Sequence, residues 1–144
     1  MTPSIPANLN AVNARITRAS AECGRTADSV TLLAVSKPFP AGAVRACAAA
    51  GQRAFGENYV QEGVEKIAEL QDLNLEWHFI GPIQSNKTKP IAEHFAWVHG
   101  IERDKIARRL SDARPAHLPA LNVCIQVNVS NEDSKSGVAP GETA

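Results

Sequence analysis

The chain has 144 residues, 44% of them hydrophobic and 21% charged, which is typical of one globular domain. Its 15 basic and 15 acidic residues give zero formal net charge, so no overall field favours nucleic acid or an anionic membrane as a partner. No apolar run approaches the roughly 18 residues of a membrane-spanning helix, and the N-terminus lacks the features of a secretory signal. We therefore expect a cytoplasmic protein that binds neither nucleic acid nor membrane.

Helical and strand patterns alternate along the chain. Apolar residues at steps of three and four over 9–23 predict an amphipathic helix, and the continuous apolar run 30–35 predicts a strand buried on both faces. Residues 41–50 follow as a short alanine-rich helix. The rest of the pattern predicts strands at 53–56, 76–80, 96–99 and 120–128, helices at 59–71, 85–95 and 103–113, and a last helix opening at Pro140.

The helix over 59–71 has a periodic apolar face. Val60, Val64, Ile67 and Gln71 lie three or four residues apart, so we expect these side chains to face the core.

Strict strand–helix alternation predicts a parallel sheet with helical crossovers, either doubly wound or a (β/α) TIM barrel. Neither Gly-rich phosphate-loop pattern is present, which disfavours a nucleotide-binding doubly wound sheet. A complete eight-unit barrel usually needs about 200 residues or more. The chain supplies only about five units. The alternatives are therefore an open five-stranded sheet and one partial-barrel domain over 1–144 whose remaining units are missing.

In both parallel architectures, functional side chains gather where the strands end. Lys37 comes directly after the predicted strand 30–35. Its amine is a candidate nucleophile toward a carbonyl group, although a lysine at a strand end can also simply reach water. Position alone leaves both interpretations open.

Three further residues at strand ends or within strands are candidates for ligand contact. Asn58 and Tyr59 place an amide and an aromatic ring at a helix start, where they suit a planar ligand, although Asn58 can equally cap the helix. His78 lies inside a strand, where a structural histidine is the favoured interpretation. The other histidines and the three cysteines lack metal-ligand spacing, so no metal site and no catalytic acid–base set are predicted.

Taken together, these motifs resemble the pyridoxal phosphate homeostasis protein family, which has the alanine racemase N-terminal barrel fold. The resemblance is carried by residues 32–37 (LLAVSK), 55–62 (FGENYVQE), 77–87 (WHFIGPIQSNK) and 126–137 (QVNVSNEDSKSG). It implies that Lys37 forms a Schiff base with pyridoxal 5'-phosphate (PLP), that Asn58 contacts the cofactor ring, and that Lys135 lies in a loop near the site. With Tyr59 and His78, these residues form the candidate cofactor-binding set.

The chain departs from the family pattern in two respects. Phe39 stands where many relatives carry a second lysine. The resemblance also places the phosphate-binding groups and an arginine on later strands, so the chain looks like a C-terminally truncated member that holds PLP weakly. The full-length relatives are expected to be monomers, whereas unpaired strand edges would favour self-association of the fragment.

The leading functional interpretation is a non-catalytic PLP carrier in vitamin B6 homeostasis that supplies PLP-dependent client enzymes. The first alternative is a PLP-dependent amino-acid racemase, which needs two acid–base groups flanking the cofactor. Racemases of this fold type take a tyrosine from a separate C-terminal domain, whereas Tyr59 is the single tyrosine here. The second alternative is a truncated module that no longer binds PLP.

Overall fold

The computed structural model describes residues 4–133 and 136–143, in which strands and helices alternate in the predicted order. The helices are α1 (Ile5–Glu22), α2 (Ala41–Ala49), α3 (Val60–Glu69), α4 (Thr88–His94) and α5 (Asp104–Ala113). The strands are β1 (Ala34–Val35), β2 (Ala54–Glu57), β3 (Glu76–Phe79), β4 (Trp97–Ile101) and β5 (Asn122–Ile125). Short 3-10 helices, η1 to η3, cover Ala27–Ser29, Ser85–Lys87 and Pro140–Glu142.

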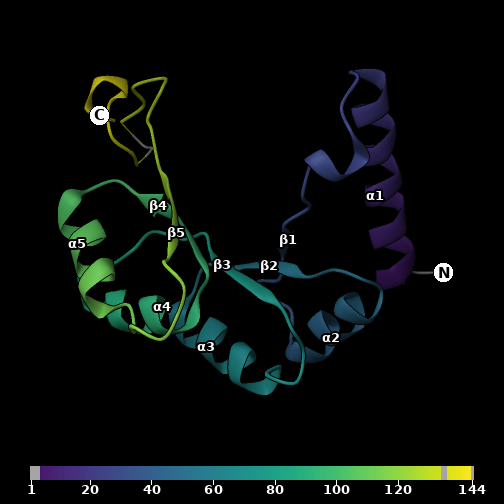
Figure 1. Ribbon diagram of the computed structural model, residues 1–144, viewed down its shortest axis with the longest axis horizontal. Coiled ribbons are helices and arrows are strands. Elements are labelled where there is room, and N and C mark those ends of the chain that lie inside the picture. Colours follow the sequence, from purple (N-terminus) through teal and green to yellow (C-terminus); the bar gives the residue numbers. More distant parts are fainter. Residues whose placement is uncertain (1–3, 134–135, 144) are drawn as a thin grey trace.

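The five strands form one parallel sheet in the order β1-β2-β3-β4-β5. Figure 1 shows a curved sheet with α2 to α5 along one side, while α1 and the C-terminal segment rise at its two ends. A doubly wound sheet would reverse its strand order at an internal switch point and carry helices on both faces. The sequential order and the single helical layer therefore confirm the barrel-type prediction, with five β-strands of the barrel present.

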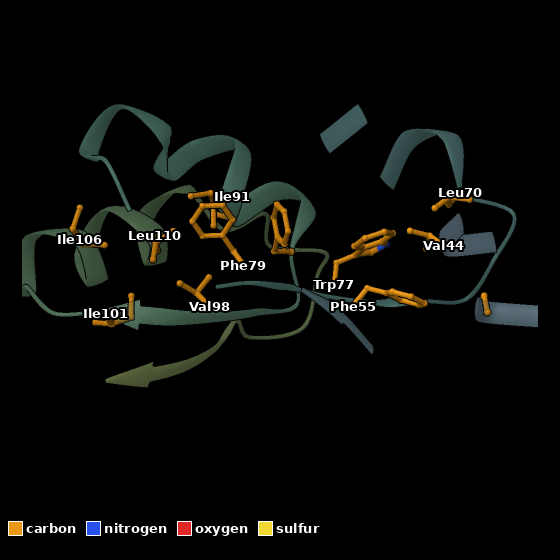
Figure 2. Close-up of a cluster of buried hydrophobic side chains, with 13 residues drawn as sticks. Val44, Phe55, Leu70, Trp77, Phe79, Ile91, Val98, Ile101, Ile106 and Leu110 are labelled. Atoms are coloured by element: carbon orange, nitrogen blue, oxygen red, sulfur yellow. The ribbon is translucent and has the colours of Figure 1, made fainter. Parts of the chain in front are cut away.

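The hydrophobic core lies between the sheet and this helical layer (Figure 2). Phe55, Trp77, Phe79 and Val98 point from β2, β3 and β4 toward the helices and are buried. Phe79 meets Phe95 edge-to-face with ring centroids 5.4 Å apart, a favoured aromatic geometry. Because alternate strand residues point to opposite faces, the neighbours of these core residues face the concave side of the sheet.

Two predicted strands are shorter and less buried than expected. The prediction of a strand over 30–35 buried on both faces is wrong, because β1 has two residues and Val35 is 48% exposed. Among the described residues β1 pairs with β2 alone, so no second neighbour extends or covers it. The strand predicted over 120–128 is likewise reduced to β5, whose Val123 and Ile125 are about half exposed.

The predicted inward face of the third helix is also partly wrong. Gly63, Lys66 and Leu70 are buried, whereas Gln71 is exposed beyond the end of α3. A Cβ on Gly63 would lie 2.9 Å from Phe95 Cζ, so the missing side chain lets the aromatic ring approach the helix there. Gly63 and Lys66 thus lie on the buried face of α3.

The remaining helix predictions need smaller corrections. The helix predicted over 85–95 divides into η2 and α4, and Pro90 causes no break because it lies in the first turn of α4. The helix predicted to open at Pro140 is the 3-10 helix η3. Within residues 4–133 and 136–143, no helix has the length and apolar character needed to cross a membrane.

Candidate functional site

Lys37 lies at the tip of a turn that follows β1. The Phe39 N–H donates to the Ser36 carbonyl at 2.8 Å, so the chain closes a tight turn with Lys37 and Pro38 at its centre. Lys37 is exposed, and within the described residues its ammonium group makes no hydrogen bond or ion pair. The lysine selected from the sequence is therefore presented at the strand ends and is available to a ligand.

A buried polar network holds the residue before Lys37. The Ser36 hydroxyl donates its single proton to the Glu57 carboxylate, and the Gly56 carbonyl lies 3.2 Å from the same hydroxyl as a second acceptor. Lys66 of α3 lies 3.1 Å from both Glu57 carboxylate oxygens and donates to the Ser36 carbonyl at 3.0 Å. Glu57 is 0% exposed and Lys66 is 5% exposed, so this ion pair is buried. Glu62, 3.0 Å from Lys66 Nζ, supplies a further acceptor.

Asn58 follows this network at the end of β2 and keeps an unused acceptor. Its side-chain Oδ1 is buried and has no hydrogen-bond partner among the described residues. The capping alternative is not realised, because Tyr59 occupies the N-cap position of α3 and makes no side-chain capping bond. A buried acceptor without a donor is costly, so Asn58 is suited to accept a hydrogen bond from a ligand.

Two further residues define the surroundings of Asn58. A Cβ on Gly81 would lie 2.7 Å from the Asn58 backbone oxygen and 2.9 Å from its Cβ, so only glycine lets the segment after β3 approach this closely. The Tyr59 side chain, by contrast, is exposed: the residue is 66% accessible.

His78 lies on the concave side of the sheet in a fully bonded cluster. Its Nδ1 is 2.8 Å from His99 Nε2, its Nε2 is 2.7 Å from Glu76 Oε1, and its ring stacks on Trp97 at 5.5 Å. Both ring nitrogens are thus engaged, as the structural interpretation of His78 predicts. Burial, and secondly the nearby His78, lower the pKa of His99, which favours its neutral form.

The register of the sheet brings most of the predicted site residues to one region. Val35 pairs with Gly56, and Gly56 pairs with His78, so Lys37 and Asn58 both follow directly on paired strand ends. Lys135 lies outside the described residues. Among those that are described, no group of three or more histidine, cysteine or acidic side chains is arranged to hold a metal ion.

Sequence reasoning missed the residues of the buried network, which are Ser36, Glu57 and Lys66. Apolar periodicity cannot detect a buried lysine, because it assigns every charged residue to the solvent face. One usable signal was present: Glu62 and Lys66 are four residues apart on one helix, the spacing of an ion pair. His99, the partner of His78, was likewise considered only as a metal ligand.

The arrangement suits reversible capture of a carbonyl compound. An exposed primary amine on a closed turn can approach a carbonyl carbon, and the end of the neighbouring strand carries an amide oxygen that lacks a hydrogen-bond donor. Glu57 and Lys66 are paired with each other and buried, so neither side chain is presented to a ligand.

Comparisons with known proteins agree with this architecture. The family described as alanine racemase, N-terminal domain, matches residues 7–144. The chain is 64% identical over 137 residues to the pyridoxal phosphate homeostasis protein of Pseudomonas aeruginosa PAO1, covering 95% of this chain and 60% of that protein. The protein of the same name from Escherichia coli K12 is 57% identical over 138 residues, covering 94% of this chain and 59% of the relative.

Solved structures give the same result. PipY of Synechococcus elongatus PCC7942, without PLP, has a TM-score of 0.74 and 41% identity, covering 88% of this chain and 59% of PipY. PipY with PLP bound has a TM-score of 0.59 and 46% identity over 68% of this chain and 47% of PipY. The chain thus spans about 60% of the length of the curated relatives it matches. With its sequential parallel sheet and single helical layer, the chain belongs to the alanine racemase N-terminal domain family.

Proposed function

We propose that this chain is a PLP-binding protein of vitamin B6 homeostasis, which holds PLP through a Schiff base at Lys37 without catalytic turnover. The observation that carries the proposal is that the exposed, unpaired Lys37 amine and the buried, unpaired Asn58 oxygen follow two neighbouring parallel strands, β1 and β2. The names of the relatives and the PLP-bound PipY structure support the choice of PLP as the ligand.

Each chain residue has a distinct role in this proposal. Bound PLP would supply an aldehyde carbon, to which a neutral amine adds with loss of water; hydrolysis reverses the bond. Lys37 provides the amine, Asn58 accepts a hydrogen bond from the ligand, and the exposed Tyr59 ring covers one side of it. His78 forms part of the concave floor rather than a direct contact, and Lys135 enters the proposal from the family resemblance alone.

The same contacts support a carrier over a racemase. Racemisation needs one acid–base group on each face of the cofactor. On the concave side, both nitrogens of His78 already bond His99 and Glu76; on the helical side, Glu57 and Lys66 are paired with each other. The relatives' names support a role in PLP homeostasis, and a cytoplasmic location and transfer of PLP to client enzymes are further parts of the proposal.

Borohydride trapping tests the proposal. The purified chain is incubated with PLP, reduced and digested, and the phosphopyridoxyl group is located by mass spectrometry. We expect the label at Lys37, its loss in Lys37→Ala, and no change in the control Lys89→Ala, which alters an exposed lysine of α4. Labelling spread over several lysines and unchanged in Lys37→Ala would contradict the proposal and favour a module that does not bind PLP. Racemisation of L-alanine by the PLP-loaded chain would favour the enzyme alternative.

A further inference from the structure

The ion pair between Glu57 and Lys66 is the most deeply buried charged group in the described part of the chain, yet neither residue is a candidate ligand contact. Glu57 is 0% exposed and Lys66 is 5% exposed. Isolated charges at such positions are strongly destabilising, and apolar residues of similar volume often serve equally well. This pair lies at the end of β2, next to the residue before Lys37, and this position indicates a function of the pair other than packing.

One contact of Lys66 is to a backbone group, the Ser36 carbonyl. Its ammonium donates to the Ser36 carbonyl at 3.0 Å, and the same carbonyl accepts the Phe39 N–H at 2.8 Å. The Ser36 carbonyl thus closes the turn that carries Lys37 and is itself anchored to α3. A hydrogen bond from a charged donor is stronger than a neutral one, so this anchor resists displacement of the turn.

Glu57 completes the anchor from β2. Its carboxylate accepts both from Lys66, at 3.1 Å, and from the Ser36 hydroxyl. Ser36 is therefore held through its carbonyl and its hydroxyl, and its N–H donates to the Gly56 carbonyl at 3.0 Å. All the polar groups of the residue before Lys37 are fixed, whereas the Lys37 side chain is free.

Lys66 itself cannot serve as a reactive amine. Its three ammonium protons are matched by acceptors on Ser36, Glu57 and Glu62, all within 3.1 Å. A lysine amine enclosed by these partners is 5% exposed and is not presented to a ligand. Lys37, which follows β1, and Lys66 of α3 consequently differ in role.

We propose that Glu57 and Lys66 are positioning residues, which fix the turn at Ser36 and so hold the Lys37 backbone where its amine can reach a carbonyl ligand. The inference rests on the proposed PLP function for the identity of that ligand. The fixing of the turn itself does not depend on any ligand and can be measured separately.

The decisive variant replaces both charges together, Glu57→Met with Lys66→Met. Methionine is unbranched and adapts to irregular space, and removing both partners leaves no unpaired buried charge, so the double variant is expected to fold. Ile67→Ala is the matched control, because Ile67 packs against the core from the same helix and has no polar side-chain group that could bond Ser36. Circular dichroism establishes that each variant is folded before it is compared.

Two measurements are made on each variant. The first is hydrogen exchange of the Phe39 amide, which reports the closure of the turn without any ligand. The second is the ratio of phosphopyridoxyl label at Lys37 to that at exposed Lys89 after PLP and borohydride. In the double variant we expect faster Phe39 exchange and a labelling ratio lower by about ten-fold, within the range that misplacement of a reacting group produces. In Ile67→Ala both quantities should stay near the wild-type values.

The outcomes separate the two proposals. An unchanged labelling ratio in the folded double variant would overturn the positioning role, whether or not Phe39 exchange changes, and would leave PLP binding intact. Absence of Lys37 labelling in the wild type would overturn the proposed function, while unchanged Phe39 exchange in the double variant would independently overturn the fixing of the turn. If the double variant does not fold, Glu57→Gln replaces it. This variant keeps the side-chain volume and removes the charge, and the same two measurements on it test the positioning role.

Discussion

The two sides of the sheet differ sharply at the ends of β1 and β2. On the helical side, Ser36 and Glu57 are buried and make several hydrogen bonds. The residue that follows each of them, Lys37 or Asn58, has a side chain with an unpaired polar group. Of each two consecutive residues, the first is buried with its polar groups hydrogen-bonded, and the second has a polar group that is free to bind a ligand.

Strand alternation explains how one short segment serves both purposes. Side chains of consecutive strand residues point to opposite faces, so in β2 Glu57 faces the core while Gly56 faces the concave side; beyond β1, the turn that starts at Ser36 presents Lys37 instead. Buried polar groups on the core side must be paired, because an unpaired group there costs free energy. We call the buried, hydrogen-bonded residues Ser36, Glu57 and Lys66 the fixed side, and Lys37, Asn58 and Tyr59 the open side. The fixed side holds the backbone in place, and the open side presents a reactive amine from that backbone.

The largest predicted effect comes from breaking the fixed side at one residue. Lys66→Met leaves the Glu57 carboxylate buried without its cation, which we expect to lower the free energy of unfolding by about 3–5 kcal/mol. Urea denaturation measures this change. The control Lys37→Ala, which alters the open side, should change stability by less than about 0.5 kcal/mol. Equal losses in the two variants would remove the distinction between the sides.

A smaller effect is predicted where the two sides meet at Gly81. Gly81→Ala places a Cβ 2.7 Å from the Asn58 backbone oxygen, so the strand ends must separate. We expect a loss of about 1–3 kcal/mol, together with reduced PLP trapping at Lys37. Gly42→Ala, in α2 with open space around the new Cβ, is the matched control and should be neutral or stabilising. If Gly81→Ala keeps wild-type stability and wild-type PLP trapping, the close contact between Gly81 and the Asn58 backbone is not required.

The concave floor adds a pH-dependent contribution. Burial lowers the pKa of His99 below its ordinary value of 6.5, so below that pH the unfolded chain takes up a proton more readily than the folded chain. The contribution is constant above pH 6.5, and stability is lost as pH falls from there to the folded-state pKa.

Substitution of His99 isolates this contribution. His99→Gln should flatten the loss of stability seen in urea denaturation between neutral and mildly acidic pH, whereas His117→Gln, at an exposed position, should leave the wild-type profile. Identical profiles for His99→Gln and wild type would exclude His99 as the source.

The smallest stability effect is predicted for Tyr59, on the open side. Because Tyr59 is 66% exposed, Tyr59→Ala should change the free energy of unfolding by less than about 0.5 kcal/mol. PLP trapping at Lys37 should nevertheless fall, because the ring is proposed to cover the ligand. Phe39→Ala, which removes another exposed aromatic ring near Lys37, serves as the comparison. Equal trapping in Tyr59→Ala and wild type would remove Tyr59 from the proposed contacts.

The sequence predicted the elements and the open side of the site better than the fixed side. Lys37 and Asn58 could be found because parallel strands bring their carboxyl ends to one edge, a rule that needs only the strand boundaries. The order of strands and helices followed from periodicity in the same way. Barrel topology was favoured only weakly until the sequential strand order was observed.

Burial and partners were harder to predict, for identifiable physical reasons. Lys66 is buried because Glu57, Glu62 and Ser36 meet it in space, and no local pattern encodes that meeting in full. Val35 is exposed because its strand lies at the sheet edge, a property of pairing rather than of apolar sequence. The pairing of His78 with His99 similarly depends on the register of β3 against β4.

Two lysines near the end of β1 differ: the Lys37 amine is exposed and reactive, whereas the Lys66 amine is buried and bonded to Ser36, Glu57 and Glu62. The most direct test compares their phosphopyridoxyl labelling by PLP and borohydride in the native chain and in urea. We predict native labelling at Lys37 with none at Lys66, and labelling of both once the chain is unfolded. Native labelling of Lys66 equal to that of Lys37 would contradict the account.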